Sequence, residues 1–151
     1  MNKQRCSWAG PDDIYITYHD EEWGVPTHDD KELFEMLVLE SFQAGLSWIT
    51  ILKKRENFIE AFDNFDVEKV ASYDEEKIEE LRNNAGIIRH KGKINAAINN
   101  ARIFIEIQKE YGSFSKYIWH FTEGQILIDS KENYLTNSPL SDKIAKDLKK
   151  R

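Results

Sequence analysis

The sequence predicts an all-α protein of about seven helices, and three observations support this prediction. Apolar residues recur at helical spacing in segments of ordinary helix length. Ser or Asp residues, which favour helix N-caps, precede most of those segments. Residues 124–139 form the only stretch that could hold strands, and because it is short and poor in pairing partners we expect a loop there. The chain has 151 residues, 40% of them hydrophobic and 12% aromatic, which suits one globular domain spanning residues 1–151.

Residues 1–28 show no helical periodicity, and we expect irregular structure there. Aromatic residues alternate with turn formers such as Gly10 and Pro11. A segment that holds two tryptophans and two tyrosines cannot be a solvated tail. We therefore expect it to wrap over the domain and to supply rings to a core or a pocket.

The first expected helix covers residues 30–43. Asp29 suits its N-cap, and Gly45 suits the C′ position that ends a helix. Ser47 and Asp66 are expected to cap the next two helices, at residues 48–62 and 66–73. The other expected helices cover residues 75–84, 94–111, 113–120 and a last segment that begins near Ser138 or Ser141.

Glu40 interrupts the most apolar of these helices. It shares one helical stripe with Leu33, Met36 and Leu37. A carboxylate that is buried on such a stripe must find a partner or stay protonated, because burying it unpaired is costly. Such a residue is more often kept for chemistry or recognition than for packing. The alternative is a capped or half-exposed glutamate near the helix end.

The net charge of −6 argues against a nucleic-acid partner, but the charges are unevenly distributed. Residues 1–88 hold 9 Lys and Arg against 20 Asp and Glu, a balance of −11. Residues 89–151 hold 12 against 7, a balance of +5. The basic C-terminal part therefore allows a DNA-binding face. The alternative is ordinary variation in surface charge.

The chain lacks the motifs of several enzyme and membrane classes. It has no P-loop, no Gly-x-Gly-x-x-Gly and no Gly-x-Ser-x-Gly, so nucleotide-dependent chemistry on a familiar scaffold is not expected. No apolar run is long enough to span a membrane, and the N-terminus lacks the apolar core of a signal peptide. The single cysteine, Cys6, excludes an intrachain disulfide and suits a reducing cytoplasm. Cys6 and His19 could form half of a zinc site, although two ligands are a weak signal.

Five aromatic residues flank the Glu40 helix in the sequence. They are Trp8, Tyr15, Tyr18, Trp23 and Trp48. Flat rings beside a carboxylate suit a planar cationic ligand, because the ring–cation attraction contributes about 0.5–2 kcal/mol in addition to the ion pair. The alternative for each ring is a place in the hydrophobic core.

Four blocks of the sequence resemble the constitutive bacterial type I 3-methyladenine DNA glycosylases. They are CSW (residues 6–8), YITYHDEEWGVP (15–26), LFEM with the stretch to Glu40 and QAGLSWITILKKRE (33–56), and AGIIRHKGKI (85–94). The resemblance runs from Cys6 to Arg151. It implies an α-helical fold of the helix-hairpin-helix glycosylase superfamily. It also implies excision of N3-alkylated adenine from double-stranded DNA, free 3-methyladenine as the product and a monomer as the acting form.

The same resemblance implies roles for the candidate site residues. Glu40 would be the catalytic residue and would hydrogen-bond the flipped base. Tyr18 and Trp48 would stack on the base, and Tyr15 and Trp8 would form further walls. The expected reaction uses water as the nucleophile and no lysine, because N3-methylation makes adenine a cationic leaving group.

The resemblance also implies a DNA wedge and a structural zinc ion. Gly45 and Leu46 would enter the gap in the DNA, and Cys6 and His19 would be two of four zinc ligands. Members of the family continue past the position of Arg151, with a hairpin that grips the DNA and the other two zinc ligands. We therefore expect a C-terminally truncated glycosylase domain, the alternative being a non-catalytic module that retains an alkylated-purine pocket.

Overall fold

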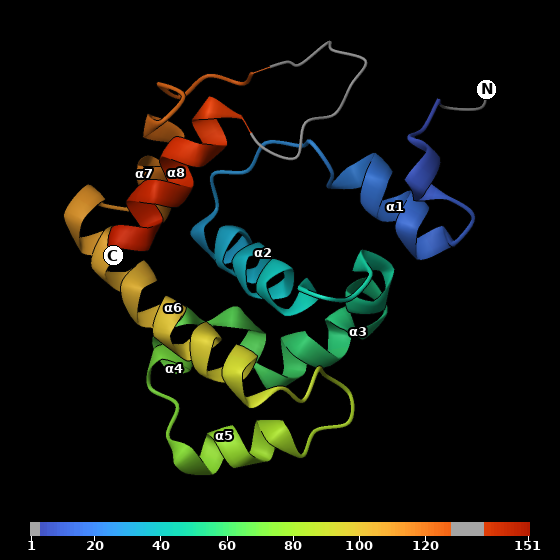
Figure 1. Cartoon of the computed structure of the whole chain (residues 1–151), viewed down its shortest axis with the longest axis vertical. Helices are drawn as coiled ribbons and strands as arrows, with labels where there is room; N and C mark the ends of the chain where they lie inside the picture. The colour runs from blue at the N-terminus through green and yellow to red at the C-terminus, as the bar shows by residue number, and fades with distance from the viewer. Residues whose placement is uncertain (1–3, 128–137) are drawn as a thin grey trace.

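The structure, a computed structural model, describes residues 4–127 and 138–151, and all regular elements in those ranges are helices (Figure 1). The predicted all-α class is confirmed. None of the described helices is long and apolar enough to cross a membrane. The elements are η1 (Ser7–Ala9), α1 (Asp13–Glu21), α2 (Asp30–Gln43), α3 (Trp48–Ala61), η2 (Asp63–Phe65), α4 (Val67–Ala71), α5 (Glu75–Arg82), α6 (Lys91–Tyr111), α7 (Phe114–His120) and α8 (Pro139–Lys150).

The prediction of irregular structure over residues 1–28 is wrong, because Asp13–Glu21 form helix α1. Tyr15, Tyr18 and His19 have the i, i+3, i+4 spacing of one helical face, and this signal was present in the sequence. The helix buries none of its residues, so the sequence has no strong apolar stripe to mark it. With α1 included, the described ranges hold eight α-helices where about seven were expected.

Most of the expected helix ends are confirmed by their capping contacts. The side chain of Asp29 accepts from the backbone N–H groups of Lys31 and Glu32, and Gly45 lies in the left-handed region at φ 79°. Asp66, Asp74, Ser113 and Ser138 each accept from a backbone N–H of their own helix. Ser47 makes no such bond, and its hydroxyl meets that of Thr50 instead. Residues 128–137 of the expected loop lie outside the described residues.

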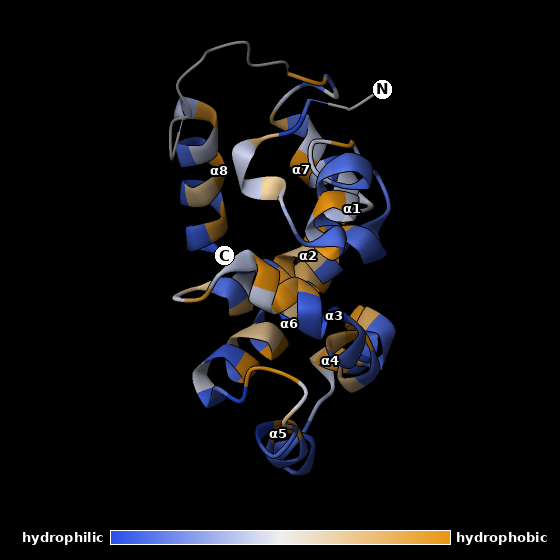
Figure 2. Ribbon diagram, turned by 90° about the vertical axis from the view of Figure 1, so that its right-hand side faces the viewer, coloured by the Kyte–Doolittle hydropathy of each residue, from blue (hydrophilic) through white to orange (hydrophobic). Residues whose placement is uncertain are grey.

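Helix α2 lies at the centre of the core. Figure 2 shows apolar residues concentrated around it, whereas α5 at the edge is mostly hydrophilic. Phe34 and Phe42 are buried near its two ends. The ring of Phe34 lies 5.2 Å from Phe104 of α6, and the ring of Phe42 lies 5.0 Å from Phe58 of α3. Such edge-to-face pairs, together with the buried apolar area, fix the orientation of α2 about its own axis between α3 and α6.

The first residue of α2 connects it to α6 and α7. The carboxylate of Asp30 accepts hydrogen bonds from the Gln108 side chain at 2.9 Å and from the backbone N–H groups of Phe114 and Ser115 at 2.9 and 2.8 Å. These two amides belong to the first turn of α7, whose N–H groups have no partners within the helix. Asp30 thereby joins three helices at one point.

We predict that Asp30→Ala lowers the free energy of unfolding by about 2–4 kcal/mol, because it leaves half-buried donors without an acceptor. Urea denaturation measures the change. Glu56→Ala, at an exposed site on α3, is the control and should change the same quantity by less than about 0.5 kcal/mol. A loss for Asp30→Ala no larger than that of the control would contradict the role of Asp30.

Candidate functional site

A cavity of about 510 Å³ lies where η1, α1, α2 and α3 meet, and we call it the ring cavity. Its volume falls in the usual range for small-ligand sites. It brings together all five residues predicted to bind or act on a base. Its lining residues are Trp8, Tyr15, Tyr18, Trp23, Glu40, Gln43 and Trp48.

The rings contact one another around this cavity. The ring centroid of Trp8 lies 5.2 Å from Tyr15, 6.3 Å from Tyr18 and 5.5 Å from Trp23. Tyr18 and Trp48 lie 5.5 Å apart at an interplanar angle of 57°. A base held between two parallel rings needs about 7 Å, twice the usual carbon contact distance. At 5.5 Å the two rings are too close to hold a base between them. A base therefore either packs against the cavity-facing sides of Tyr18 and Trp48 or requires the two rings to move apart.

Glu40 is exposed, which corrects the prediction of a carboxylate buried on an apolar stripe. Phe34, Val38, Leu39 and Phe42 form the buried face of α2, whereas Leu33, Met36 and Leu37 of the Glu40 stripe are only half-buried against the core. Partial burial among the neighbouring side chains raises the pKa of the Glu40 carboxyl. Among the residues that the structure describes, no hydrogen bond or ion pair reaches this carboxylate.

The environment of the ring cavity disfavours negative charge. The pKa of the Tyr18 hydroxyl is raised by burial and, to a smaller extent, by the charges of Glu40 and Glu22. The indole N–H of Trp48 is buried and has no acceptor in the described part of the chain. An unpaired buried donor costs about 1–3 kcal/mol. The site therefore holds an unpaired carboxylate and an unpaired donor beside several ring faces.

Arg55 of α3 holds α1 in place next to this cavity, and sequence reasoning missed it. Its Nε donates to Glu35 Oε1 at 2.8 Å, and a terminal nitrogen donates to Glu22 Oε1 at 2.6 Å. The two carboxylates keep the pKa of Arg55 above its ordinary value despite partial burial. Glu22 follows the last residue of α1, so the contact links the end of α1 to α2 and α3. No spacing in the sequence indicates a contact between residues 33 positions apart.

Gly45 and Leu46, the predicted wedge, form the tip of the turn between α2 and α3. Both are exposed, Leu46 by 36%. Gln43, which lines the ring cavity, donates through Nε2 to the Leu46 carbonyl at 2.6 Å. Gln43 was missed as a site residue, although its position three residues after Glu40 places both on one helical face.

A family model described as methyladenine glycosylase matches residues 8–151. The chain belongs to this family. It is 48% identical to DNA-3-methyladenine glycosylase 1 of Escherichia coli, over 98% of this chain and 81% of that protein. A crystal structure of 3-methyladenine DNA glycosylase I matches with a TM-score of 0.92 at 50% identity, covering 97% of this chain and 82% of the other. The glycosylase I of Staphylococcus aureus, studied for its recognition of 3-methyladenine, matches with a TM-score of 0.90 at 39% identity, covering 97% and 79%.

The structure brings the two predicted zinc ligands of this chain together. The backbone N–H of Cys6 donates to His19 Nε2 at 3.4 Å, and His19 Nδ1 lies 3.0 Å from Asp20 Oδ1. Arg5 binds the same Asp20 carboxylate through two nitrogens. A structural zinc ion requires four ligands, and the described residues contain no group of three or more His, Cys, Asp or Glu side chains that could hold a metal. These residues alone do not fit a structural zinc site.

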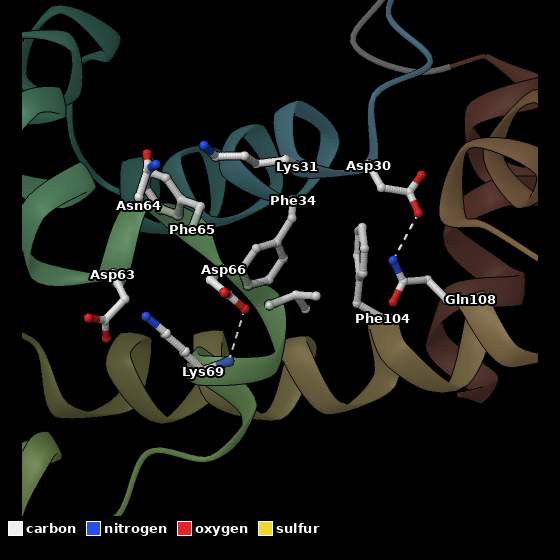
Figure 3. A pocket seen from close by; sticks show the side chains of 11 residues that line it. Asp30, Lys31, Phe34, Asp63, Asn64, Phe65, Asp66, Lys69, Phe104 and Gln108 are labelled. Carbon is white, nitrogen blue, oxygen red and sulfur yellow. Dashed lines mark hydrogen bonds between the residues drawn. The ribbon is translucent and has the colours of Figure 1, made fainter.

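A second cavity, of about 440 Å³, lies on another side of the methyladenine glycosylase, between α2, η2, α4 and α6 (Figure 3). Its carboxylates are already engaged: Asp30 by α6 and α7, Asp63 by the Tyr73 hydroxyl and Asp66 by a backbone N–H of α4. Its rings, Phe34, Phe65 and Phe104, belong to the core and are nearly inaccessible. Its described lining therefore lacks the unpaired carboxylate and the accessible rings that distinguish the ring cavity.

We predict that Glu40→Gln raises the melting temperature at pH 7 by up to about 3 °C. A carboxyl whose pKa is raised by folding binds its proton more tightly in the folded state, so its ionised form destabilises the fold. The gain should disappear as the pH falls below the ordinary glutamate pKa of about 4.3, where Glu40 is protonated in both states. Thermal melts at several pH values measure the difference, and a gain that grows at low pH would contradict the sign.

We also predict that the 151-residue polypeptide binds zinc well below one ion per chain, because Cys6 and His19 supply two of the four ligands. Metal analysis of the purified chain measures this ratio. Cys6→Ser should leave the already low ratio unchanged. One tightly bound zinc ion per chain would show that other residues complete the site.

Proposed function

We propose that this chain hydrolyses the N-glycosidic bond of 3-methyladenine in alkylated DNA after the base has flipped out of the helix. The observation that carries the proposal is the unpaired Glu40 carboxylate at the edge of a cavity walled by five aromatic rings. That arrangement selects a flat cation. The relatives from Escherichia coli and Staphylococcus aureus are DNA-3-methyladenine glycosylases, which supports the same assignment.

The reaction requires little catalytic power beyond selective binding. N3-methylation places a positive charge on the base, so the departing base takes the bond electrons readily. Glu40 complements this charge in a site of lowered dielectric. Stacking on Tyr18 and Trp48 adds about 0.5–2 kcal/mol of ring–cation attraction, which offsets part of the few kcal/mol that base flipping costs.

Water is the nucleophile in this proposal. The described lining of the ring cavity contains no lysine or cysteine, so it offers no amine for a Schiff base and no thiolate. Glu40 is also the only carboxylate in that lining. Its charge can stabilise the positive charge that develops on the sugar as the base leaves.

DNA binding is assigned to the α2–α3 turn and to the turn between α5 and α6. Leu46 at the first turn has the size and exposure to fill the gap that a flipped base leaves. At the second turn, Arg89 and Lys91 are exposed, and the N–H groups of Lys91 and Gly92 at the start of α6 make no hydrogen bond within the described residues. Cations and free helix N–H groups suit phosphates.

This second turn is a candidate DNA-gripping hairpin within the described residues, whereas the sequence resemblance led us to expect one after Arg151. Helix α5, the turn after Arg82 and helix α6 already form two packed helices joined by a short connection. The family resemblance of residues 85–94 coincides with that connection. We therefore propose that it is the hairpin that holds the DNA backbone.

Incubating the 151-residue chain with methylated duplex DNA and measuring released 3-methyladenine tests the proposal. We expect release by the unaltered chain and a decrease of about 10–100-fold for Glu40→Gln, because a charge-assisted contact contributes about 1.5–3 kcal/mol. Glu56→Gln, at an exposed site on α3, is the charge-matched control and should keep full release.

Calorimetry with free 3-methyladenine separates recognition from turnover. Binding by the unaltered chain, weakened in Glu40→Gln, supports the ring cavity as the base site. Binding without any release from DNA would support the alternative of a non-catalytic module. Equal affinity of Glu40→Gln and the unaltered chain for 3-methyladenine would contradict a role of Glu40 in binding the base.

A further inference from the structure

The basic segment at the start of α6 contains a lysine whose charge is used inside the protein. Arg89 and Lys91 are exposed and unpaired in the described structure, whereas Lys93 is only half-exposed. The Lys93 ammonium donates to the carbonyl oxygen of Phe42 at 2.9 Å and to that of Ala44 at 2.7 Å. The Lys93 ammonium therefore binds the end of α2, although Lys93 and Ala44 are 49 positions apart in the sequence.

Those two carbonyls lie where α2 ends. The last four carbonyls of an α-helix have no partner within the helix, and α2 ends at Gln43 with Ala44 as its C-cap. A cation at this position also interacts favourably with the negative end of the helix dipole. Lys93 thus caps the C-terminus of α2 from a different helix.

The capped carbonyls flank the turn that carries the wedge. Gln43 lies between Phe42 and Ala44. Its backbone carbonyl accepts from the Leu46 N–H at 2.7 Å, and its side chain donates to the Leu46 carbonyl at 2.6 Å. Gly45, at φ 79°, has no atom beyond its chain neighbours within 4 Å of the place where a Cβ would lie, so this side of the turn is open. Gln43 therefore holds Leu46 directly, and Lys93 holds the carbonyls on either side of Gln43.

We propose that Lys93 is a positioning residue that couples the DNA-holding turn of α5 and α6 to the Gly45–Leu46 wedge and the ring cavity. This inference rests on the proposed function. Lys93 shares a basic segment with Arg89 and Lys91 but does not contact phosphate. Its ammonium fixes where Leu46 stands relative to the hairpin, so that one docking step aligns the wedge with the base to be flipped.

The first test separates a phosphate contact from a positioning role by the salt dependence of DNA binding. Each phosphate contact contributes about 0.9 to the slope of log K against log salt concentration for duplex DNA. Lys91→Met should lower this slope by about 1. Lys93→Met keeps the aliphatic stem and removes the ammonium, and it should keep the slope of the unaltered chain.

The second test measures single-turnover release of 3-methyladenine with the chain in excess over DNA. Lys93→Met should slow release by about 10–100-fold, the loss expected when a wedge and a base pocket are misaligned. Lys93→Arg retains a cation that can donate to both carbonyls and should recover most of the rate. Lys109→Met, at an exposed site on the same helix, is the control and should release base at the unaltered rate.

A double-mutant cycle with Leu46→Ala shows whether Lys93 acts through the wedge. If it does, Lys93→Met slows release much less in the Leu46→Ala background than alone, so the two effects are not additive. Additive effects, a salt slope for Lys93→Met as low as that for Lys91→Met, or release at the unaltered rate would each overturn the inference. If Lys93→Met melts below the assay temperature, Lys93→Gln replaces it under the same criteria.

Failure of the proposed function would be visible separately. In that case the unaltered chain would release no base from DNA. The salt slopes of Lys91→Met and Lys93→Met would still differ if Lys93 caps α2, and would still agree if it binds phosphate.

Discussion

The rotation of α2 between α3 and α6 determines how the whole site is arranged. Phe34 and Phe42, two turns apart, pack against rings of α6 and α3, respectively. With both rings buried, the helix cannot turn about its axis without exposing large apolar surface. Glu40 lies on the side away from these rings. The hydrophobic core therefore determines that this carboxylate faces the ring cavity.

One wall of the cavity comes from a segment that has little core of its own. Helix α1 buries no residue, and it is held by the ion pairs of Arg55 with Glu22 and Glu35 and by the contact of Tyr18 with Trp48. Because the rings of α1 are not buried in the core, they are available to a ligand. The α1 residues that line the cavity thus contribute little to the buried core.

The electrostatics of the site follow from the same arrangement. Glu40 has no cationic partner among the described residues, while Arg55 nearby is occupied by two other carboxylates. Partial burial raises the pKa of the Glu40 carboxyl, and burial together with the charge of Glu40 raises that of the Tyr18 hydroxyl. A cationic base supplies the missing partner. At the C-terminal end of the same helix the charge is reversed: the Lys93 ammonium donates to backbone carbonyls that have no hydrogen-bond donor within the helix.

The sequence by itself determined the helical class and most helix ends, and it predicted residues that prove to line one cavity, because these depend on local spacing, capping chemistry and motif resemblance. Glu40, Tyr18 and Trp48 were identified in this way. The tertiary structure decided which face of α2 is buried and hence that Glu40 is exposed. It also revealed α1, whose weak apolar pattern hid it, and showed that Cys6 and His19 are adjacent in space. The roles of Arg55 and Lys93 came only from the structure, because each contacts residues more than 30 positions away that no local pattern connects.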